Sequence, residues 1–587
     1  MAQFRSMVIT AAGQALIAKM MAGNATIKFS KFGLSETEYT DEQLGALTSV
    51  AKINQTTNIS KVTKTSSSAV LVEGAFSNDT LTTGYYVNTL VLYAEDPDDG
   101  EIPYAACGAE IRGWMAPFNG LSTGGAYVKM VITVQNADKV NLIVDPAGYA
   151  TIGDINDLQG QIDELQAYMG YTDDSIYGVE VDFKNNKFTR LAGAKNLTSG
   201  TDFDNIEPWH RRRCNLADDG TVNAYLGDAG YKEDGSNGQV MVEQPKFWYK
   251  VVPLETEKVP AKTVEANSQS YSFSEYTVAR KLRYYVSPQP KAGFKLHPAF
   301  IKNGEELDKI YVSAFEGSLY DTSAGAYIKD DAQVADFAAD KLSSIAGAKP
   351  LSGLTQNATR ANIRALAEKR GANWEQSLVQ AVCATELLAL IEYATFDLQT
   401  AIGTGATALT DDSKSSMTVN TGATSALGNK SGTAETSYNG TVVQVVSYRG
   451  EENLWGNIWT WFDGLNRYLN KIYIADHGFA DGTESSPYDF ALECSPEEGY
   501  VSAFSYSEEY DWLFVAGEVK GDSAKPVGDY FWIYLPNTRA VAMLGGGWND
   551  GSYAGLFCWH LTDAASDRNR GVGGRLVFRP VAKSAAA

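Results

Sequence analysis

The chain has 587 residues and a formal net charge of −22, with a pI near 4.7. This length allows three or more domains, at least one of them with a sizeable core. The excess of acid argues against a nucleic-acid partner, because phosphate binding needs concentrated Lys and Arg, and equally against an anionic membrane surface. No apolar run is long enough for insertion into a membrane. The five cysteines are too scattered, and odd in number, for a disulfide framework or a paired-cysteine metal site.

Residues 1–150 predict an α+β domain. Thr10 is placed to cap a helix that runs through Lys19 and ends at Gly23. A strand is expected at 26–32, where apolar and polar residues alternate, and further strands at 69–72, 85–93 and 127–134. The run ITAAGQALIAKMMAGNATIKFSKFGLSE resembles the N-terminal region of bacteriophage tail fibre proteins, which attaches the fibre to the particle. The alternative is an α+β domain of another kind.

Residues 151–175 carry the clearest periodicity of the chain. Five apolar residues follow the 3-4-3-4 spacing of a coiled coil, namely Ile155, Leu158, Ile162, Leu165 and Met169. The repeat covers about two heptads, roughly 22 Å of helix, a length that needs flanking domains to hold it together. We expect a short coiled-coil oligomerisation segment and, from the fibre resemblance, a homotrimer. The alternative is one amphipathic helix that packs on its own domain.

The second half of the chain is predicted to comprise a β-rich segment at 176–285 and a ligand-binding domain at 286–587. Apolar faces predict helices over 358–370 and 377–399. Residues 401–437 are dominated by Gly, Ala, Ser and Thr, a composition that buries little, so we expect an exposed insertion or mobile loop. Eight of the eleven tryptophans lie from Trp374 onward. They predict a core in which large rings pin long loops.

Two motifs in this half carry a resemblance. The first, WGNIWTW from Trp455, is similar to the signature of formylglycine-generating-type C-type lectin domains. The second is a pair of glycine-rich sequences, GGGW and GGRLVFR, which mark the start and the end of a variable region at 545–575. The bracketed segment resembles the variable region of proteins that are diversified by retroelements. The resemblance implies a C-type-lectin-like domain whose structural motif residues are Trp455, Gly456, Asn457, Trp459, Gly546, Trp548, Gly574 and Arg575.

Between the brackets, acid, base, hydroxyl, thiol and aromatic side chains occur without a helical or strand period. The resemblance implies that these side chains form a variable contact patch made of Asp550, Tyr553, Cys558, His560, Thr562, Asp563, Asp567 and Arg570. Rings supply contact area at low entropic cost, and charged groups supply hydrogen bonds. We expect these side chains to point outward from a stiff frame that buried indoles brace.

The expected fold class is therefore α+β and multidomain, with an N-terminal attachment domain, a short coiled coil and a C-terminal lectin-like domain. The resemblance implies a receptor-binding tail fibre protein of a bacteriophage, made in the bacterial cytoplasm and carried on the virion at the tail tip or fibre. Its partners would be a bacterial surface receptor, protein or glycan, and phage tail or baseplate proteins. No catalytic residue, cofactor or metal is expected, because formylglycine-generating enzymes use cysteines near the end of this domain and Cys558 is the one thiol there. The alternatives are a bacterial surface adhesin and a glycan-processing enzyme on the same fold.

Overall fold

A computed structural model describes residues 2–23, 26–66, 68–118, 124–133, 140–141, 152–355 and 357–580. The chain forms two compact units, Met1–Gln159 (unit 1) and Gly160–Ala587 (unit 2). The structure is mostly β, with 41% strand and 12% helix, arranged in many small sheets. The predicted α+β class with a coiled coil is therefore wrong. The prediction is wrong because unit 2 consists mainly of short strands and long loops. The apolar periodicity of its few helices is the clearest pattern in its sequence.

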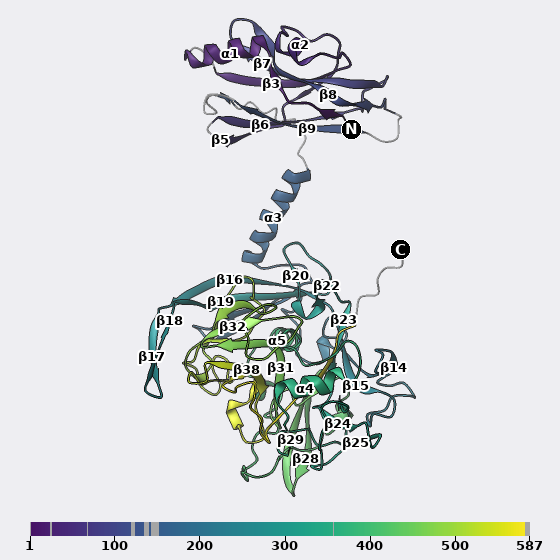
Figure 1. Ribbon diagram of the computed structural model, residues 1–587, viewed down its shortest axis with the longest axis vertical. Helices are drawn as coiled ribbons and strands as arrows, with labels where there is room; N and C mark the ends of the chain where they lie inside the picture. The colour runs from purple at the N-terminus through teal and green to yellow at the C-terminus, as the bar shows by residue number, and fades with distance from the viewer. Residues whose placement is uncertain are drawn as a thin grey trace. The chain divides into compact units, whose positions relative to one another are not determined.

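Unit 1 pairs a seven-stranded sheet with a three-stranded sheet (Figure 1). The larger sheet contains β1 (Gln3–Phe4), β8 (Gly100–Met115), β7 (Tyr85–Asp96), β3 (Ile27–Ser35), β10 (Val140–Asn141), β2 (Val8–Ile9) and β4 (Ile53–Asn58). The smaller contains β5 (Lys61–Ser66), β6 (Ala69–Ser77) and β9 (Gly125–Thr133). Thr10 caps α1 (Ala11–Met21), accepting from the Gly13 amide, which confirms the predicted start of that helix. The short α2 (Asp41–Gly45) begins with a capping box from Thr40 and Gln43.

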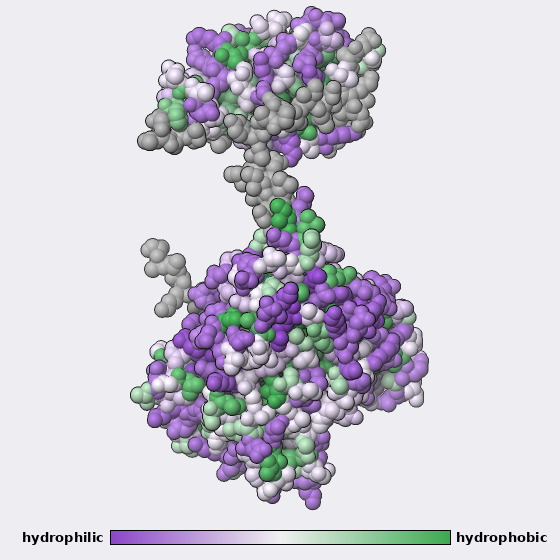
Figure 2. Space-filling view, turned by 180° about the vertical axis from the view of Figure 1, so that it is seen from behind, coloured by the Kyte–Doolittle hydropathy of each residue, from purple (hydrophilic) through white to green (hydrophobic). Residues whose placement is uncertain are grey.

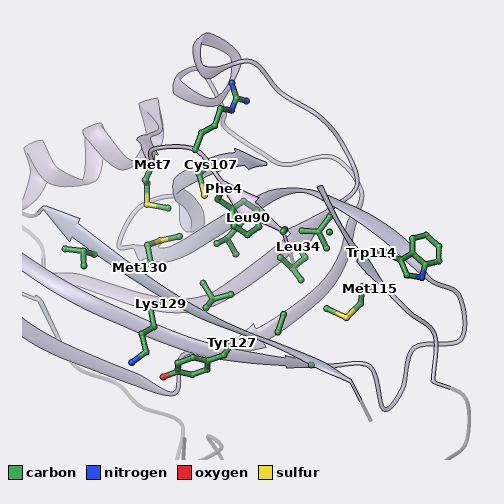
Figure 3. A pocket seen from close by; sticks show the side chains of 18 residues that line it. Phe4, Met7, Leu34, Leu90, Cys107, Trp114, Met115, Tyr127, Lys129 and Met130 are labelled. Atoms are coloured by element: carbon green, nitrogen blue, oxygen red, sulfur yellow. The ribbon is translucent and has the colours of Figure 1, made fainter. Parts of the chain in front are cut away.

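A partly open cavity of about 550 Å³ lies between strands of the two sheets of unit 1 (Figure 3). Apolar side chains such as Phe4, Leu34, Leu90 and Met130 line it. Cys107 also faces the cavity, and burial raises the pKa of its thiol to about 12. The thiol is therefore protonated at neutral pH.

Residues 152–169 form a single helix, α3 (Ile152–Met169), with no coiled coil evident among the described residues. Ile162, Leu165 and Met169 are 46%, 61% and 83% exposed. The side chains of Ile155 and Leu158 lie outside the described residues. The buried residue of the last turn is instead Ala167, which packs in a small cluster with Tyr171 and Tyr285 of unit 2. About two heptads supply too little apolar area to hold helices together alone, so packing of the last turn within unit 2 decides which face is covered.

Unit 2 is organised around α5 (Val379–Tyr393), of which every residue except Tyr393 is buried. A helix that is hydrophobic all round is typical of a core position. One sheet on it contains β12 (Lys187–Ala192), β11 (Tyr177–Asp182), β19 (Tyr276–Ser287), β16 (Trp248–Val259) and β20 (Lys295–Leu296). A second sheet contains β14 (Val222–Tyr225), β13 (Arg212–Leu216), β15 (Gln239–Pro245), β23 (Lys309–Ser313), β41 (Leu576–Phe578) and β27 (Trp374–Gln376).

The third sheet of unit 2 has eight strands and carries the variable region. It contains β33 (Asp489–Glu493), β32 (Lys471–Ile474), β31 (Trp459–Tyr468), β38 (Arg539–Gly545), β39 (Gly555–Leu561), β37 (Tyr530–Ile533), β34 (Gly499–Tyr500) and β40 (Val572–Gly573). The smaller helices are α4 (Arg360–Glu368), capped by Thr359, and α6 (Leu398–Ala401), capped by Asp397.

Small sheets and hairpins complete unit 2. They are β17 (Lys262–Ala266) with β18 (Gln269–Phe273), β21 (Ile301–Lys302) with β22 (Glu305–Glu306), β24 (Ser318–Asp321) with β25 (Ala326–Ile328) and β26 (Lys341–Ser343), β28 (Gly432–Tyr438) with β29 (Thr441–Tyr448) and β30 (Glu451–Glu452), and β35 (Ala503–Phe504) with β36 (Ala516–Glu518). Hydrophilic residues dominate the faces of the two units that Figure 2 shows, as the net charge of −22 leads one to expect. No helix among the described residues has the length and apolar character needed to span a membrane.

Residues 401–437 are not exposed throughout, although their composition predicts an exposed insertion or mobile loop. Leu409, Met417 and Val419 join a separate buried cluster with Trp548 of the variable region. The backbone amide of Leu409 also donates to the Trp548 carbonyl oxygen at 2.8 Å. The few apolar residues of this polar segment therefore pack against the variable region. Composition alone could not predict this contact.

Candidate functional site

Gly546 and Gly574, in the two sequences that mark the ends of the variable region, occupy positions where only glycine fits. Gly546 has φ +87°, and a Cβ there would lie 2.5 Å from the Cβ of Ala554. At Gly574 a Cβ would lie 2.3 Å from Cγ2 of Ile363 in α4. Both contacts are far below van der Waals distance, so the backbone approaches its neighbours closely at each end of the segment.

A buried polar network joins the two motifs. The Asn457 side chain donates to both carboxylate oxygens of Glu316, at 3.0 and 2.9 Å, and its own oxygen accepts from the Val419 amide at 2.8 Å. Burial raises the pKa of Glu316 to about 8, against the opposing effect of the nearby Arg575 guanidinium. Arg575 in turn donates to the carbonyl oxygen of Glu452 at 2.8 Å. Residues distant in sequence thus supply the hydrogen-bond partners of Asn457, Glu316 and Arg575. Such a buried network makes the structure around the two motifs more rigid.

Two of the motif indoles are buried and serve as braces. Trp455 is fully buried and donates from its ring nitrogen to the Gly403 carbonyl at 3.0 Å. Gly456, with φ +79°, lets the chain pass against Ala406, where a Cβ would lie 2.9 Å from backbone atoms. Trp548 is also buried and donates to Asp411 at 3.3 Å. These contacts tie both motifs to the 401–437 segment.

The structure places the predicted contact residues unevenly. Tyr553 is 41% exposed. Half-buried side chains are those of Asp550, His560, Thr562, Asp563, Asp567 and Arg570. Cys558 in β39 is fully buried, so a ligand at the surface would not contact it. Burial, reinforced by the Asp529 and Asp550 carboxylates, raises the pKa of its thiol well above the usual range.

Three of the half-buried charged side chains hold the loop together. Asp550 accepts from the Gly547 amide at 2.6 Å, and Asp567 accepts from the Ala564 amide at 2.9 Å. Arg570 grips both carboxylate oxygens of Asp411, at 2.8 and 2.6 Å. A bidentate pair of this kind fixes geometry as well as charge. These three side chains are predicted from the sequence to point outward as contacts for a ligand. Their carboxylate and guanidinium groups instead hydrogen-bond to other residues of the protein.

Tyr553 and His560 belong to a continuous group of rings, which we call the aromatic patch. It consists of Trp459 in β31, Tyr500 in β34, Tyr530 and Trp532 in β37, Tyr553 in the 551–553 turn, and His560 in β39. Every member except the exposed Tyr553 is half-buried. The patch therefore lies at the surface of the eight-stranded sheet.

The rings of the patch form a continuous series of contacts. Tyr553 lies 4.7 Å from Tyr530, 5.5 Å from Tyr500 and 5.6 Å from Trp532, measured between ring centroids. His560 lies 6.0 Å from Trp532 and 4.9 Å from Trp459. Trp532 and His560 are direct partners in the parallel pairing of β37 with β39, so they share one face of the sheet. Packing against one another limits the freedom of the rings before any ligand arrives.

His560 is a neutral group at this surface. Burial lowers the pKa of its imidazole to about 4, so the ring carries no charge at neutral pH. Thr562 Oγ1 lies 3.1 Å from His560 Nδ1 and donates to Asp563 at 3.0 Å. Burial raises the pKa of Asp563. The patch thus combines apolar ring area with a hydroxyl, an imidazole and an acceptor.

Sequence reasoning missed Tyr500, Tyr530 and Trp532. The signal for two of them was available, because in the run YFWIY from Tyr530 the half-buried residues alternate with buried Phe531 and Ile533. Tyr500 had no local signal, since its role depends on the pairing of β34 with β37. Trp459, expected to be a buried brace, is half-buried and hydrogen-bonds to Asp550.

The described residues offer no cluster of three or more His, Cys, Asp or Glu side chains arranged for a metal ion. All five cysteines are buried and unpaired. What the site geometry supplies is a preformed surface for contact.

No family model matches the chain, and no curated protein matches it. Among solved structures it is similar to the Major Tropism Determinant P3c Variant, U1 Variant and I1 Variant. Each is 13% identical, over 65% of this chain and 73% of the other, with a TM-score of 0.22. A TM-score at this level does not establish a common fold.

Proposed function

We propose that this protein is a receptor-binding protein of a bacteriophage tail, carried on the virion, which binds a bacterial surface receptor through the aromatic patch. The proposal includes membership of the retroelement-diversified variable proteins, with residues 545–575 as the variable region and a lectin-like frame around it. It also includes attachment to tail or baseplate proteins through unit 1, and assembly as a homotrimer. The activity proposed is binding without catalysis.

The observation that carries the proposal is the aromatic patch on its rigid support. Interface energy concentrates in a few aromatic residues, because large rings gain contact area while losing little side-chain entropy. Here six rings from four strands and one turn lie together at a surface, and Tyr553 supplies the most exposed ring. The turn that carries Tyr553 lies inside the variable region, whereas Tyr530 and Trp532 lie outside it. Substitution in the variable region would therefore change part of the surface and keep the rest.

Binding to bacterial cells tests the proposal. The labelled full-length protein is incubated with a panel of bacterial strains, and affinity is measured on a strain that it binds. Tyr553→Ala and Trp532→Ala should each weaken binding by at least about tenfold, which corresponds to about 1.4 kcal/mol.

The matched control is Phe490→Ala, a ring on the same unit that is 47% exposed but lies outside the patch. It should bind like the unaltered protein. Circular dichroism establishes that each variant is folded. If the two patch variants bind as well as the Phe490 variant, the patch is not the contact surface.

A further inference from the structure

A second, polar pocket of about 510 Å³ lies in unit 2 and is lined by elements other than those that form the aromatic patch. Its walls come from the loop at 235–238, the small sheet of β24, β25 and β26, the β14 strand, and the chain that follows α4. Its lining includes the side chains of Asp218, Asn223, Tyr320, Tyr327, Lys341 and Arg370. None of them belongs to the aromatic patch.

Two tyrosines make a rigid wall of this pocket. Tyr320 and Tyr327 pack edge to face, with ring centroids 4.9 Å apart. The hydroxyl of Tyr327 donates to the Gly235 carbonyl at 3.1 Å and accepts from Gln239 at 3.1 Å. A Cβ at Gly235 would lie 2.5 Å from this ring, so the glycine lets the loop close against it. The wall is thus fixed from both sides.

The polar groups of the pocket carry a net positive charge in a chain that is strongly acidic. Lys341 and Arg370 both bind Asp218, at 2.9 and 2.6 Å, so two cations face one carboxylate. Arg370 is buried, and two further donors of its guanidinium go to the Leu342 carbonyl and the Ser343 hydroxyl. Within the part of the chain that the structure describes, the Lys341 ammonium makes one hydrogen bond, to Asp218. Because an ammonium has three donors, two remain for a ligand.

Acceptors accompany these donors. The Asp218 side chain is 43% exposed. The surrounding Lys341 and Arg370 lower its pKa against the opposing effect of burial, so it stays ionised at neutral pH. Asn223 donates to the Asn237 carbonyl at 2.9 Å, which leaves its own carbonyl oxygen as an acceptor. A ligand with several hydroxyl groups and an apolar face matches this set of donors, acceptors and rings.

We propose that this pocket binds a pyranose sugar, and prefers one that carries a carboxylate. The sugar hydroxyls pair with Asp218, Asn223 and Lys341, and the C–H face of the ring packs on the tyrosine wall. One net positive charge about 4 Å from a carboxylate in a solvent-open site contributes about 1 kcal/mol, which corresponds to roughly fivefold in affinity. The inference does not rest on the function proposed for the aromatic patch.

Saturation-transfer NMR titration of the full chain tests it, with methyl β-glucuronide as the acidic probe and methyl β-glucoside as the neutral one. Both should bind saturably, the glucuronide roughly fivefold more tightly. Tyr320→Ala should weaken both by about tenfold. Lys341→Gln should remove the preference for the acid, whereas the exposed Lys471→Gln should leave it unchanged.

A separate substitution keeps the test informative if a wall variant does not fold. Asn223→Asp, at an exposed position, adds a second carboxylate and should abolish the preference for the glucuronide. No saturable binding of either glycoside would overturn the inference. Equal affinities for both, with no effect of Lys341→Gln, would overturn the preference for an acid. Cell binding through the aromatic patch is measured separately, so that failure of one proposal leaves the other standing.

Discussion

Substitution of Glu316 by Gln gives the sharpest test of the buried frame. Glu316 is 1% exposed and receives two hydrogen bonds from Asn457 and one from Asn453, at 3.1 Å. The side-chain oxygen of Asn453 is buried without a hydrogen-bond donor among the described residues. The three hydrogen bonds from Asn457 and Asn453 favour the ionised carboxylate, so they oppose the rise in the pKa of Glu316, which burial causes.

The magnitude follows from the difference between the two states. In the unfolded chain the Glu316 carboxyl has a pKa near 4.5, and in the folded protein burial raises its pKa to about 8. Below pH 4.5 both states hold the proton, and the stability of the folded state is complete. As pH rises toward 8 the unfolded state releases the proton first, so the free energy of unfolding falls. The slope approaches about 1.4 kcal/mol per pH unit between the two pKa values, and the loss between pH 5 and pH 8 is about 3.5 kcal/mol.

Urea unfolding followed by tryptophan fluorescence measures this loss. Of the eleven tryptophans only Trp114 lies in unit 1, so the signal reports on unit 2. Relative to Glu316→Gln, the unaltered protein should lose about 3.5 kcal/mol between pH 5 and pH 8. Glu435→Gln, at an exposed position, is the matched control and should keep the slope of the unaltered protein. If Glu316→Gln also keeps that slope, Glu316 is ionised in the folded state and the reasoning is refuted.

Three further predictions concern the frame and its loops. Gly546→Ala should destabilise unit 2 by more than about 2 kcal/mol, because it adds a clash to an unfavourable φ. The control Gly551→Ala, at a position with φ +56° and open space, should destabilise it by about 1 kcal/mol. Equal losses of unfolding free energy in urea would argue against the close approach at Gly546. Arg570→Ala should raise hydrogen exchange in residues 409–419, because the bidentate bond to Asp411 is lost; unchanged protection would contradict this coupling. Finally, the native protein should show no fast-reacting thiol in a titration at pH 8, because burial raises the pKa of Cys558 and of the other buried cysteines; a fast-reacting thiol would show that one is accessible.

Local signals predicted the local structure well. The Thr10 cap and the apolar faces of α4 and α5 could be read from neighbouring residues, because a helix is specified by contacts three or four positions apart. The period at 155–169 was equally clear, yet it does not produce a coiled coil. There the outcome depends on what α3 contacts in unit 2, and the period carries no information about that.

The candidate site was predictable in place but not in detail. The glycine brackets located the segment, and Tyr553 lies at its surface. The burial of Cys558 could not be predicted from strand alternation, because Cys558 and the half-buried His560 are two positions apart in β39 and therefore belong to the same face of the strand. Arg570 bonds to Asp411 across 159 positions of sequence. Contacts over such separations are set by the fold and leave no local pattern.

Oxidative footprinting of the full-length protein, free and bound to cells of a strain that it recognises, tests the central claim most directly. The claim is that the aromatic patch contacts the bacterial surface. On cell binding, oxidation of Tyr553 and Trp532 should fall by at least about fivefold, while oxidation of the exposed Phe490 should stay unchanged. Unchanged oxidation of Tyr553 and Trp532 on bound protein would contradict the claim.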